Sequence, residues 1–179
     1  TVSPGFVHEM KELLPRETLL VDAPMSGAPH SARSGNLTFM LGGPSTLLED
    51  WNPLFECMGQ QIHQLGELGA GMSVKVLNNY VASSSVVTIR RVLEECSRMK
   101  VSPEKLLEVM SESSGGTWFG NQFEVIDWAR EGYSPDNTIG ILEKDVNSFL
   151  KAIDKKPFPE DVLLLERLRN LKAFDAEKE

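Results

Sequence analysis

The chain has 179 residues, a formal net charge of −8 and 41% hydrophobic residues, a composition typical of a globular protein. The acidic balance excludes nonspecific nucleic-acid binding through a basic face, and no apolar run of about eighteen residues is present to span a membrane. Cys57 and Cys96 are far apart, so they predict neither a metal-type pair nor a disulfide framework.

The first third of the chain alternates predicted helices and strands. Residues 4–14 form a predicted helix with Pro4 in its first turn, and the apolar run 18–21 predicts a buried strand. The stretch 22–35 is rich in Pro, Gly and Ser, which predicts a long loop of the kind that often carries function. The elements expected next are a strand over 36–41, a helix over 44–56 and a strand over 60–65.

The remainder of the chain is predicted to be helical. A run without Pro or Gly over 72–100 predicts a long central helix, with Ser73 near its cap. Ser102 followed by Pro103 is typical of a helix start. The further helices are expected over 103–112, 118–130, 139–153 and 161–174. The predicted fold class is therefore mainly α, with the edge of an α/β sheet before an all-helical part.

Two stretches carry candidate binding chemistry. Ser26-Gly27 presents a hydroxyl and an unscreened backbone N–H, which are suited to hold a carboxylate, although the same loop has an equally good interpretation as a plain connection. Lys75 and Asn79 lie four residues apart and therefore on one helix face, where they could hold and protonate an oxygen of a small molecule. By themselves they are also explained as a solvated lysine and its polar neighbour.

Other functional patterns are absent or incomplete. The glycines of Gly66-x-x-Gly69-x-Gly71 precede a helix, but their spacing departs from the dinucleotide pattern Gly-x-Gly-x-x-Gly, so we reject a nucleotide site there. His8, His30 and His63 have no carboxylate or cysteine at ligand spacing, and we predict no metal site. No Gly-x-Ser-x-Gly elbow supports a serine hydrolase.

Three motifs in order resemble the β-hydroxyacid dehydrogenase family, which includes 3-hydroxyisobutyrate dehydrogenases and tartronate semialdehyde reductases. They are Asp22-Ala-Pro-Met-Ser-Gly27 running to Gly43, then Gly69-x-Gly71-x-x-x-Lys75-x-x-x-Asn79, then Lys144-Asp145. The opening Thr1-Val-Ser-Pro4 and the junction Ser114-Gly-Gly-Thr-Trp118 are also similar to segments of that family. The resemblance covers most of residues 1–150.

The resemblance implies a role for each matching residue. Ser26 and Gly27 would hold the substrate carboxylate, Lys75 would be the general acid/base and Asn79 would position the substrate beside it. Lys144, Asp145 and Thr1 would lie at the cofactor, NAD or NADP. The implied reaction is hydride transfer between the nicotinamide and a short 3-hydroxy acid or its semialdehyde.

The resemblance also implies an architecture. Residues 1–66 would be the last part of a Rossmann-type α/β domain, and residues 67–179 an all-helical domain similar to the C-terminal domain of 6-phosphogluconate dehydrogenase. Because the family's glycine-rich fingerprint lies upstream of the Thr-Val-Ser-Pro segment, we expect this chain alone to be inactive and to bind no cofactor tightly.

The family assembles as dimers or tetramers, so we expect a homo-oligomer formed through the helical domain. The alternative function is a non-catalytic oligomerisation or interaction module that lost the cofactor half. The compartment stays open between cytoplasm and mitochondrion, because no targeting segment is visible.

Overall fold

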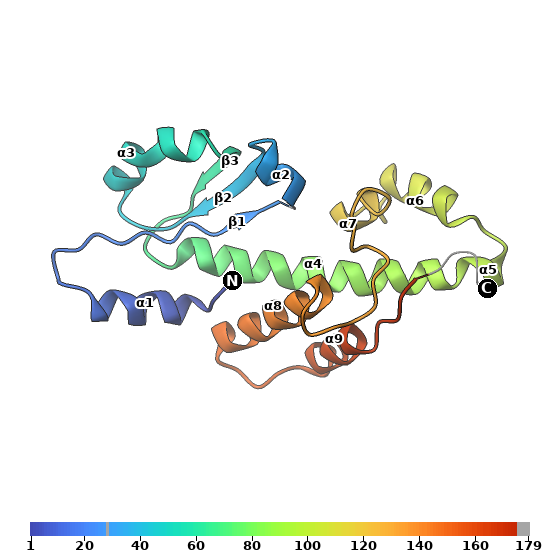
Figure 1. Cartoon of the computed structure of the whole chain (residues 1–179). Helices are drawn as coiled ribbons and strands as arrows, with labels where there is room; N and C mark the ends of the chain where they lie inside the picture. Colours follow the sequence, from blue (N-terminus) through green and yellow to red (C-terminus); the bar gives the residue numbers. More distant parts are fainter. Residues whose placement is uncertain (28, 175–179) are drawn as a thin grey trace. The chain divides into compact units, whose positions relative to one another are not determined.

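The computed structural model describes residues 1–27 and 29–174 of the chain. Its backbone divides into two compact units, and each is considered by itself. The first comprises residues 1–78 and 148–154, and the second comprises residues 79–147 and the chain from 155 onward. Helix α4, Ala70–Glu94, begins in the first unit and continues into the second (Figure 1).

The first unit is built on a three-stranded sheet in the order β1-β2-β3. Strand β1 (Met25–Ser26) pairs antiparallel with β2 (Leu37–Leu41), and β2 pairs parallel with β3 (Gly59–Gln64). Helix α3 (Ser45–Glu56) lies beside this sheet (Figure 1). The buried residues between them form the core: Leu37, Phe39, Leu41, Leu48 and Phe55. The first 33 residues also contain two helices, α1 (Pro4–Leu13) and α2 (Pro29–Arg33).

The predicted strand over 18–21 is wrong. Leu19 is 62% exposed, and residues 18–21 are not assigned to any strand. The next residue, Asp22, forms an isolated bridge with Gly42, just beyond the end of β2. Part of the reason is that the Lys11 ammonium binds the Thr18 carbonyl, which removes a backbone acceptor from strand pairing. The loop expected over 22–35 also contains regular structure, namely β1 and α2.

Every element after β3 in the described part of the chain is a helix. Besides α4 these are α5 (Cys96–Met99), α6 (Pro103–Ser111), α7 (Trp118–Asn121), α8 (Thr138–Ile153) and α9 (Pro159–Arg169). Ser102 caps α6, because its hydroxyl accepts from the Lys105 N–H at 3.2 Å, as the sequence predicts. Ser73 is not a cap: it lies within α4 and its hydroxyl donates to the Gly69 carbonyl at 2.8 Å.

The helix predicted over 118–130 is much shorter than expected. Phe119, Phe123, Ile126 and Ala129 are all buried, so their spacing correctly identified the core face. After Asn121, however, the backbone continues in turns, such as the one closed by Ala129 N–H and the Ile126 carbonyl at 3.0 Å. Successive turns closed between residues three apart bury apolar residues at almost the same spacing as a helix does.

A buried arginine organises the second unit. Arg90 of α4 has no exposed surface, and its guanidinium donates to the carbonyls of Ala129 at 2.9 Å, Glu131 at 2.8 Å and Lys172. Burial lowers the Arg90 pKa from its ordinary value. Because one side chain binds two segments remote in sequence, it fixes the turns before α8 and the segment after α9 against α4.

Candidate active site

The turn that opens α4 is closed by a carboxylate from the distant Asp22. The Asp22 side chain is 5% exposed and accepts from the N–H of Gly69 at 2.6 Å and of Met72 at 2.5 Å. A carboxylate is stabilised there because it satisfies unpaired amides at the positive end of the helix dipole. These amides are consequently unavailable to a phosphate, which agrees with rejecting this glycine turn as a nucleotide site.

Two glycines allow this close approach. A Cβ on Gly42 would lie 2.4 Å from Asp22 Oδ1, and one on Gly71 would lie 2.2 Å from the Met40 carbonyl oxygen. Gly69 adopts φ +89°, a backbone conformation that favours glycine. The glycines before Lys75 therefore pack α4 against the end of β2.

Lys75 and Asn79 lie one turn apart on α4. The Lys75 side chain is half-buried, and Asn79 is 9% exposed. The Asn79 amide Nδ2 donates to Asp145 Oδ2 of α8 at 2.6 Å. The structure thus joins two predicted site residues that are 66 positions apart.

The Lys144-Asp145 pair separates into two different environments. Lys144 is exposed, whereas Asp145 is 4% exposed. Asp145 Oδ1 is buried and has no hydrogen-bond partner within the described part of the chain. Because the Asn79 amide binds the other oxygen, Asp145 is placed to orient Asn79.

Ser26 and Gly27 lie at the edge of the sheet. Ser26 is in β1 opposite Thr38 of β2, and its side chain is half-buried. Gly27 adopts φ +134°, and a Cβ there would meet Ser31 Cβ at 2.9 Å. Only glycine fits this backbone, and its N–H follows directly after the Ser26 hydroxyl in the chain.

Sequence reasoning missed a second buried carboxylate that binds α4, at Tyr80, the residue after Asn79. Asp161 of α9 is 4% exposed; its Oδ1 accepts from the Tyr80 hydroxyl at 2.6 Å, and its Oδ2 accepts from the Phe158 N–H at 2.8 Å. The hydrogen bond to Asp161 is the main cause that raises the pKa of Tyr80 to about 12. The sequence signal was an acidic residue in the first turn after Pro159, which predicts a capped helix but not its partner on α4.

The predicted site residues belong to both units. Thr1, Ser26, Gly27 and Lys75 are in the first, and Asn79, Lys144 and Asp145 are in the second. No group of three or more potential metal-ligating side chains occurs among the residues described, and no described helix is long and apolar enough to cross a membrane.

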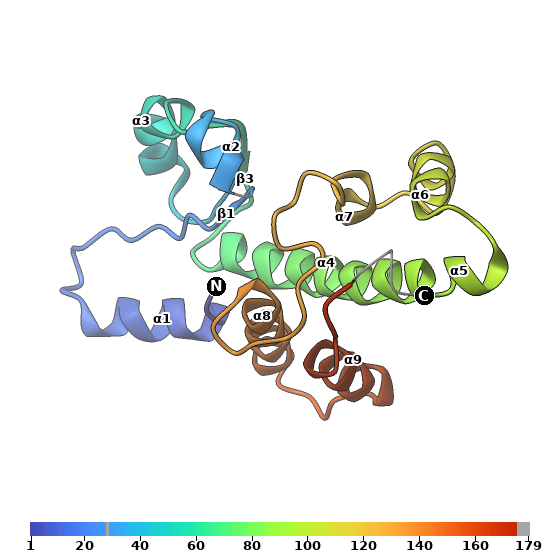
Figure 2. The ribbon, with the colours of Figure 1, turned by 45° about the vertical axis from the view of Figure 1, so that its right-hand side comes forward.

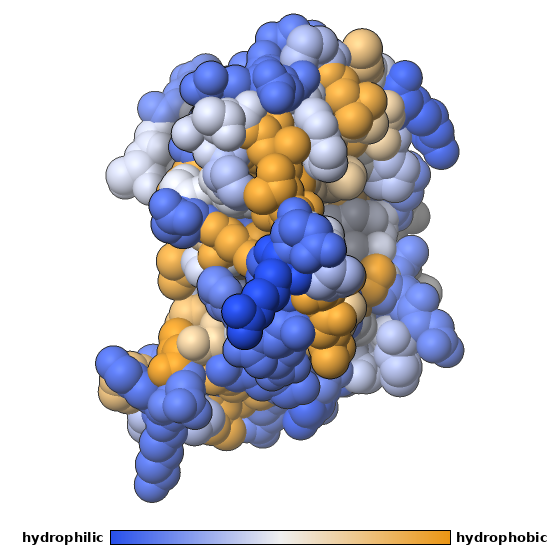
Figure 3. Space-filling model, turned by 90° about the vertical axis from the view of Figure 1, so that its left-hand side faces the viewer, coloured by the Kyte–Doolittle hydropathy of each residue, from blue (hydrophilic) through white to orange (hydrophobic). Residues whose placement is uncertain are grey.

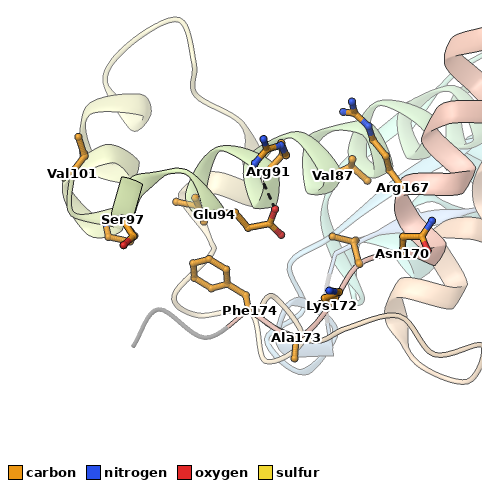
Figure 4. Close-up of a pocket in the computed structure, with 13 residues that line it drawn as sticks. Val87, Arg91, Glu94, Ser97, Val101, Arg167, Asn170, Lys172, Ala173 and Phe174 are labelled. Atoms are coloured by element: carbon orange, nitrogen blue, oxygen red, sulfur yellow. Dashed lines mark ion pairs between the residues drawn. The ribbon is translucent and has the colours of Figure 1, made fainter. Parts of the chain in front are cut away.

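A cavity of about 770 Å³ lies in the second unit and contains none of the predicted site residues. It is bounded by the end of α4, the start of α6 and the segment after α9 (Figure 4). Its walls combine apolar side chains such as Val87 and Phe174 with the charged Arg91, Glu94 and Arg167. The Arg91 guanidinium is 3.8 Å from the Glu94 carboxylate, so part of this charge is neutralised within the cavity wall.

Two family models match the chain. Residues 4–66 match the NAD-binding domain of 6-phosphogluconate dehydrogenase, and residues 69–165, more than half of the chain, match the model described as the NAD-binding domain of NADP-dependent 3-hydroxyisobutyrate dehydrogenase. The second range includes Lys75, Asn79, Lys144 and Asp145.

Individual relatives agree with the models. Mitochondrial 3-hydroxyisobutyrate dehydrogenase of Mus musculus is 31% identical over 138 residues, which are 76% of this chain and 41% of that protein. The NAD-dependent L-serine dehydrogenase of Pseudomonas aeruginosa is 38% identical over 103 residues, 58% of this chain and 35% of the relative. The chain thus spans well under two thirds of these relatives.

The fold has a solved counterpart. The 3-hydroxyisobutyrate dehydrogenase of Mycobacterium tuberculosis, solved with L-serine, gives a TM-score of 0.76 over 96% of this chain and 65% of its own, at 23% identity. This likeness supports the predicted Rossmann-type fold. The two family matches and the relatives confirm the predicted family and its cofactor class, NAD or NADP. The chain belongs to the β-hydroxyacid dehydrogenase family, the NAD(P)-dependent oxidoreductases that include 3-hydroxyisobutyrate dehydrogenase.

Proposed function

We propose that this chain supplies the substrate loop and the acid/base helix of an enzyme that transfers hydride between NAD or NADP and a short 3-hydroxy acid or its semialdehyde. The observation that carries the proposal is the buried hydrogen bond between Asn79 and Asp145, which joins two motifs of the family's pattern across the second unit. In this proposal residues 1–66 serve the cofactor and the substrate carboxylate, and residues 67–179 serve acid/base chemistry and assembly.

The substrate is held through its carboxylate and its oxygen. The Ser26 hydroxyl and the Gly27 N–H donate to the carboxylate, as two donors adjacent in the chain at the edge of the sheet. Lys75 removes the proton of the substrate hydroxyl during oxidation, or returns one to the carbonyl oxygen during reduction. Asn79, one turn further along α4, fixes the position of that oxygen.

The cofactor, when bound, supplies or accepts the hydride at the substrate carbon. By the family resemblance, Thr1 and Lys144 would hold its nicotinamide end; the Lys144 side chain is exposed on α8. The turn before α4 does not fit its pyrophosphate, because Asp22 takes the N–H groups of Gly69 and Met72. Asp145, expected at the cofactor, is buried, so we assign it the orientation of Asn79.

We further propose that the second unit mediates a homo-oligomer, a dimer or a tetramer. Its part of α4 exposes Val81 at 64% and Val92 at 37%, and both line an apolar cavity of about 340 Å³ with Met110. An exposed apolar face of this kind is stabilised when a second copy covers it. Figure 3 shows one face of the molecule, on which hydrophobic side chains lie exposed among hydrophilic ones. Light scattering on the whole enzyme tests the assembly, and a monomer at micromolar concentration would contradict it.

Substitution of Lys75 tests the catalytic proposal. In the whole enzyme, Lys75→Ala should lower kcat by about 10²–10⁴-fold, because the proton of the substrate oxygen loses its acceptor. Cofactor binding, followed by NADH fluorescence, should stay within about twofold, since Lys75 acts on the substrate side. Lys151→Ala, an exposed lysine of α8, is the matched control with unchanged turnover. Near-normal turnover of Lys75→Ala would exclude the assigned role.

Cofactor binding by the whole protein, compared with the 179-residue chain, distinguishes the enzyme from the non-catalytic alternative. We expect no saturable NADH fluorescence change at micromolar concentration, because the phosphate-binding fingerprint is not in these residues. The whole enzyme should bind NADH and oxidise a 3-hydroxy acid. Failure of the whole protein to bind any nicotinamide cofactor would instead favour an oligomerisation module.

A further inference from the structure

Asp22 lies where three parts of the first unit meet. Its backbone N–H and carbonyl form the isolated bridge with Gly42, at 2.9 and 2.8 Å, just beyond the end of β2. Its side chain binds the first turn of α4 through Gly69 and Met72. The chain then leaves Asp22 directly toward β1, which carries Ser26.

The burial of Asp22 shows how tightly this junction is made. A buried carboxylate is costly unless hydrogen bonds satisfy it, and here both oxygens accept main-chain N–H groups at 2.6 and 2.5 Å. Gly42 and Gly71 leave no room for side chains at the same point, since a Cβ on Gly71 would lie 2.9 Å from Asp22 Oδ2. The position of the carboxylate therefore determines how the helix start meets the sheet.

We infer that Asp22 is a positioning residue that sets the catalytic lysine relative to the substrate loop. The inference rests on the proposed function of Lys75, Ser26 and Gly27. Met72, held by one oxygen of Asp22, precedes Lys75 by less than one helical turn. Ser26 follows Asp22 by four residues and is fixed by pairing with β2. The Asp22 carboxylate thus fixes the start of the helix that carries Lys75, and the Asp22 backbone begins the segment that leads to Ser26.

The test replaces one oxygen of this carboxylate. In the whole enzyme, Asp22→Asn keeps the size of the side chain but turns a donor amide toward a main-chain N–H. We expect kcat to fall about 10–100-fold and the KM for the hydroxy acid to rise, because misplacement by about 1 Å costs this much. The KM for the cofactor should not change. A loss of folded enzyme alone would lower the apparent kcat and leave both KM values unchanged, so the rise in the hydroxy-acid KM is the result that shows misplacement.

A second readout follows the contact itself. Amide hydrogen exchange at Gly69 and Met72 should accelerate at least tenfold in Asp22→Asn, while amides of α3 keep their protection. Ser102→Ala, which removes the cap of the remote helix α6, is the matched control with unchanged kinetics. If Asp22→Asn does not fold, Asp22→Glu, which keeps the charge and both oxygens, replaces it in both measurements.

The outcomes distinguish this inference from the proposed function. Wild-type kcat and KM in the Asp22 variant, together with an inactive Lys75→Ala, would overturn the positioning role and leave the proposed function intact. Active Lys75→Ala would overturn the proposed function itself. Loss of turnover with both KM values unchanged, or with an equal change in the cofactor KM, would show a general structural defect and would also overturn the inference.

Discussion

The hydrogen bond between Tyr80 and Asp161 gives a quantitative prediction about stability. Tyr80→Phe removes only the hydroxyl, so the ring packing remains while Asp161 Oδ1 loses its donor at 2.6 Å. Asp161 is 4% exposed, and among the described residues it keeps the Phe158 N–H at 2.8 Å as a donor. Hydrogen bonds to charged groups contribute about 1.5–3 kcal/mol, so we expect a loss of about 2 kcal/mol in the free energy of unfolding.

Urea unfolding followed by circular dichroism measures this loss directly. For a chain of this length, about 2 kcal/mol corresponds to a decrease in Tm of about 4–8 °C. Tyr133→Phe is the matched control, because the Tyr133 hydroxyl also donates to a carboxylate, Glu143, at 2.5 Å. Glu143 retains Arg169 at 2.6 Å, so its loss should be about 1 kcal/mol or less. A Tyr80→Phe variant no less stable than Tyr133→Phe would refute the reasoning.

The pH dependence supplies a second check. The hydrogen bond to Asp161 raises the pKa of Tyr80 to about 12, above the usual value of about 10. A raised pKa means that the folded state retains the proton that the unfolded state has lost. The stabilisation by Tyr80 is therefore fully present below pH about 10 and is lost as the pH rises through about 12. The difference between wild type and Tyr80→Phe should be constant near neutral pH and should shrink in this alkaline window.

Three further substitutions test the packing described above. Arg90→Met should lower the free energy of unfolding, measured in urea, by about 3–5 kcal/mol, because three carbonyl groups lose their donor. A change below about 1 kcal/mol would contradict the role of Arg90 in holding these segments against α4. Gly71→Ala should cost at least about 2 kcal/mol through the 2.2 Å contact with Met40, whereas Gly5→Ala in α1, with no close contact, should be neutral or stabilising by up to about 1 kcal/mol. Equal thermal midpoints for these two glycine variants would refute the close approach. Ser102→Ala should cost about 1 kcal/mol as a lost helix cap, and an unchanged Tm would show that its bond to Lys105 contributes nothing.

The sequence alone was sufficient for features that depend on neighbouring residues. The α6 cap by Ser102, the start of α1 at Pro4 and the long helix before Glu94 all follow from residues within one or two turns of each other. Apolar spacing also identified the buried residues of the 118–130 stretch. It could not establish their backbone conformation, because turns and helices bury side chains at similar intervals.

The same limit applies to the candidate site. Helical spacing singled out Lys75 and Asn79, the long loop singled out Ser26, and the family resemblance added Asp145; the family matches cover the ranges that contain them. The family resemblance implied a place for Asp145 at the cofactor; the structure shows that this side chain is buried and that its Oδ2 binds Asn79. A one-residue difference along α8 separates the exposed Lys144 from the buried Asp145, and only the packing of α8 determines which side chain faces inward.

Tertiary structure decided the contacts that cross long stretches of chain. Asp22 reaches Gly69 across 47 residues, Asn79 reaches Asp145 across 66 and Arg90 reaches Lys172 across 82. No local pattern encodes such pairs, because their partners meet only after the sheet, the glycines and the helices have packed. The residues that could act on a substrate were therefore visible in the sequence, while the buried groups that hold them in place emerged only from the fold.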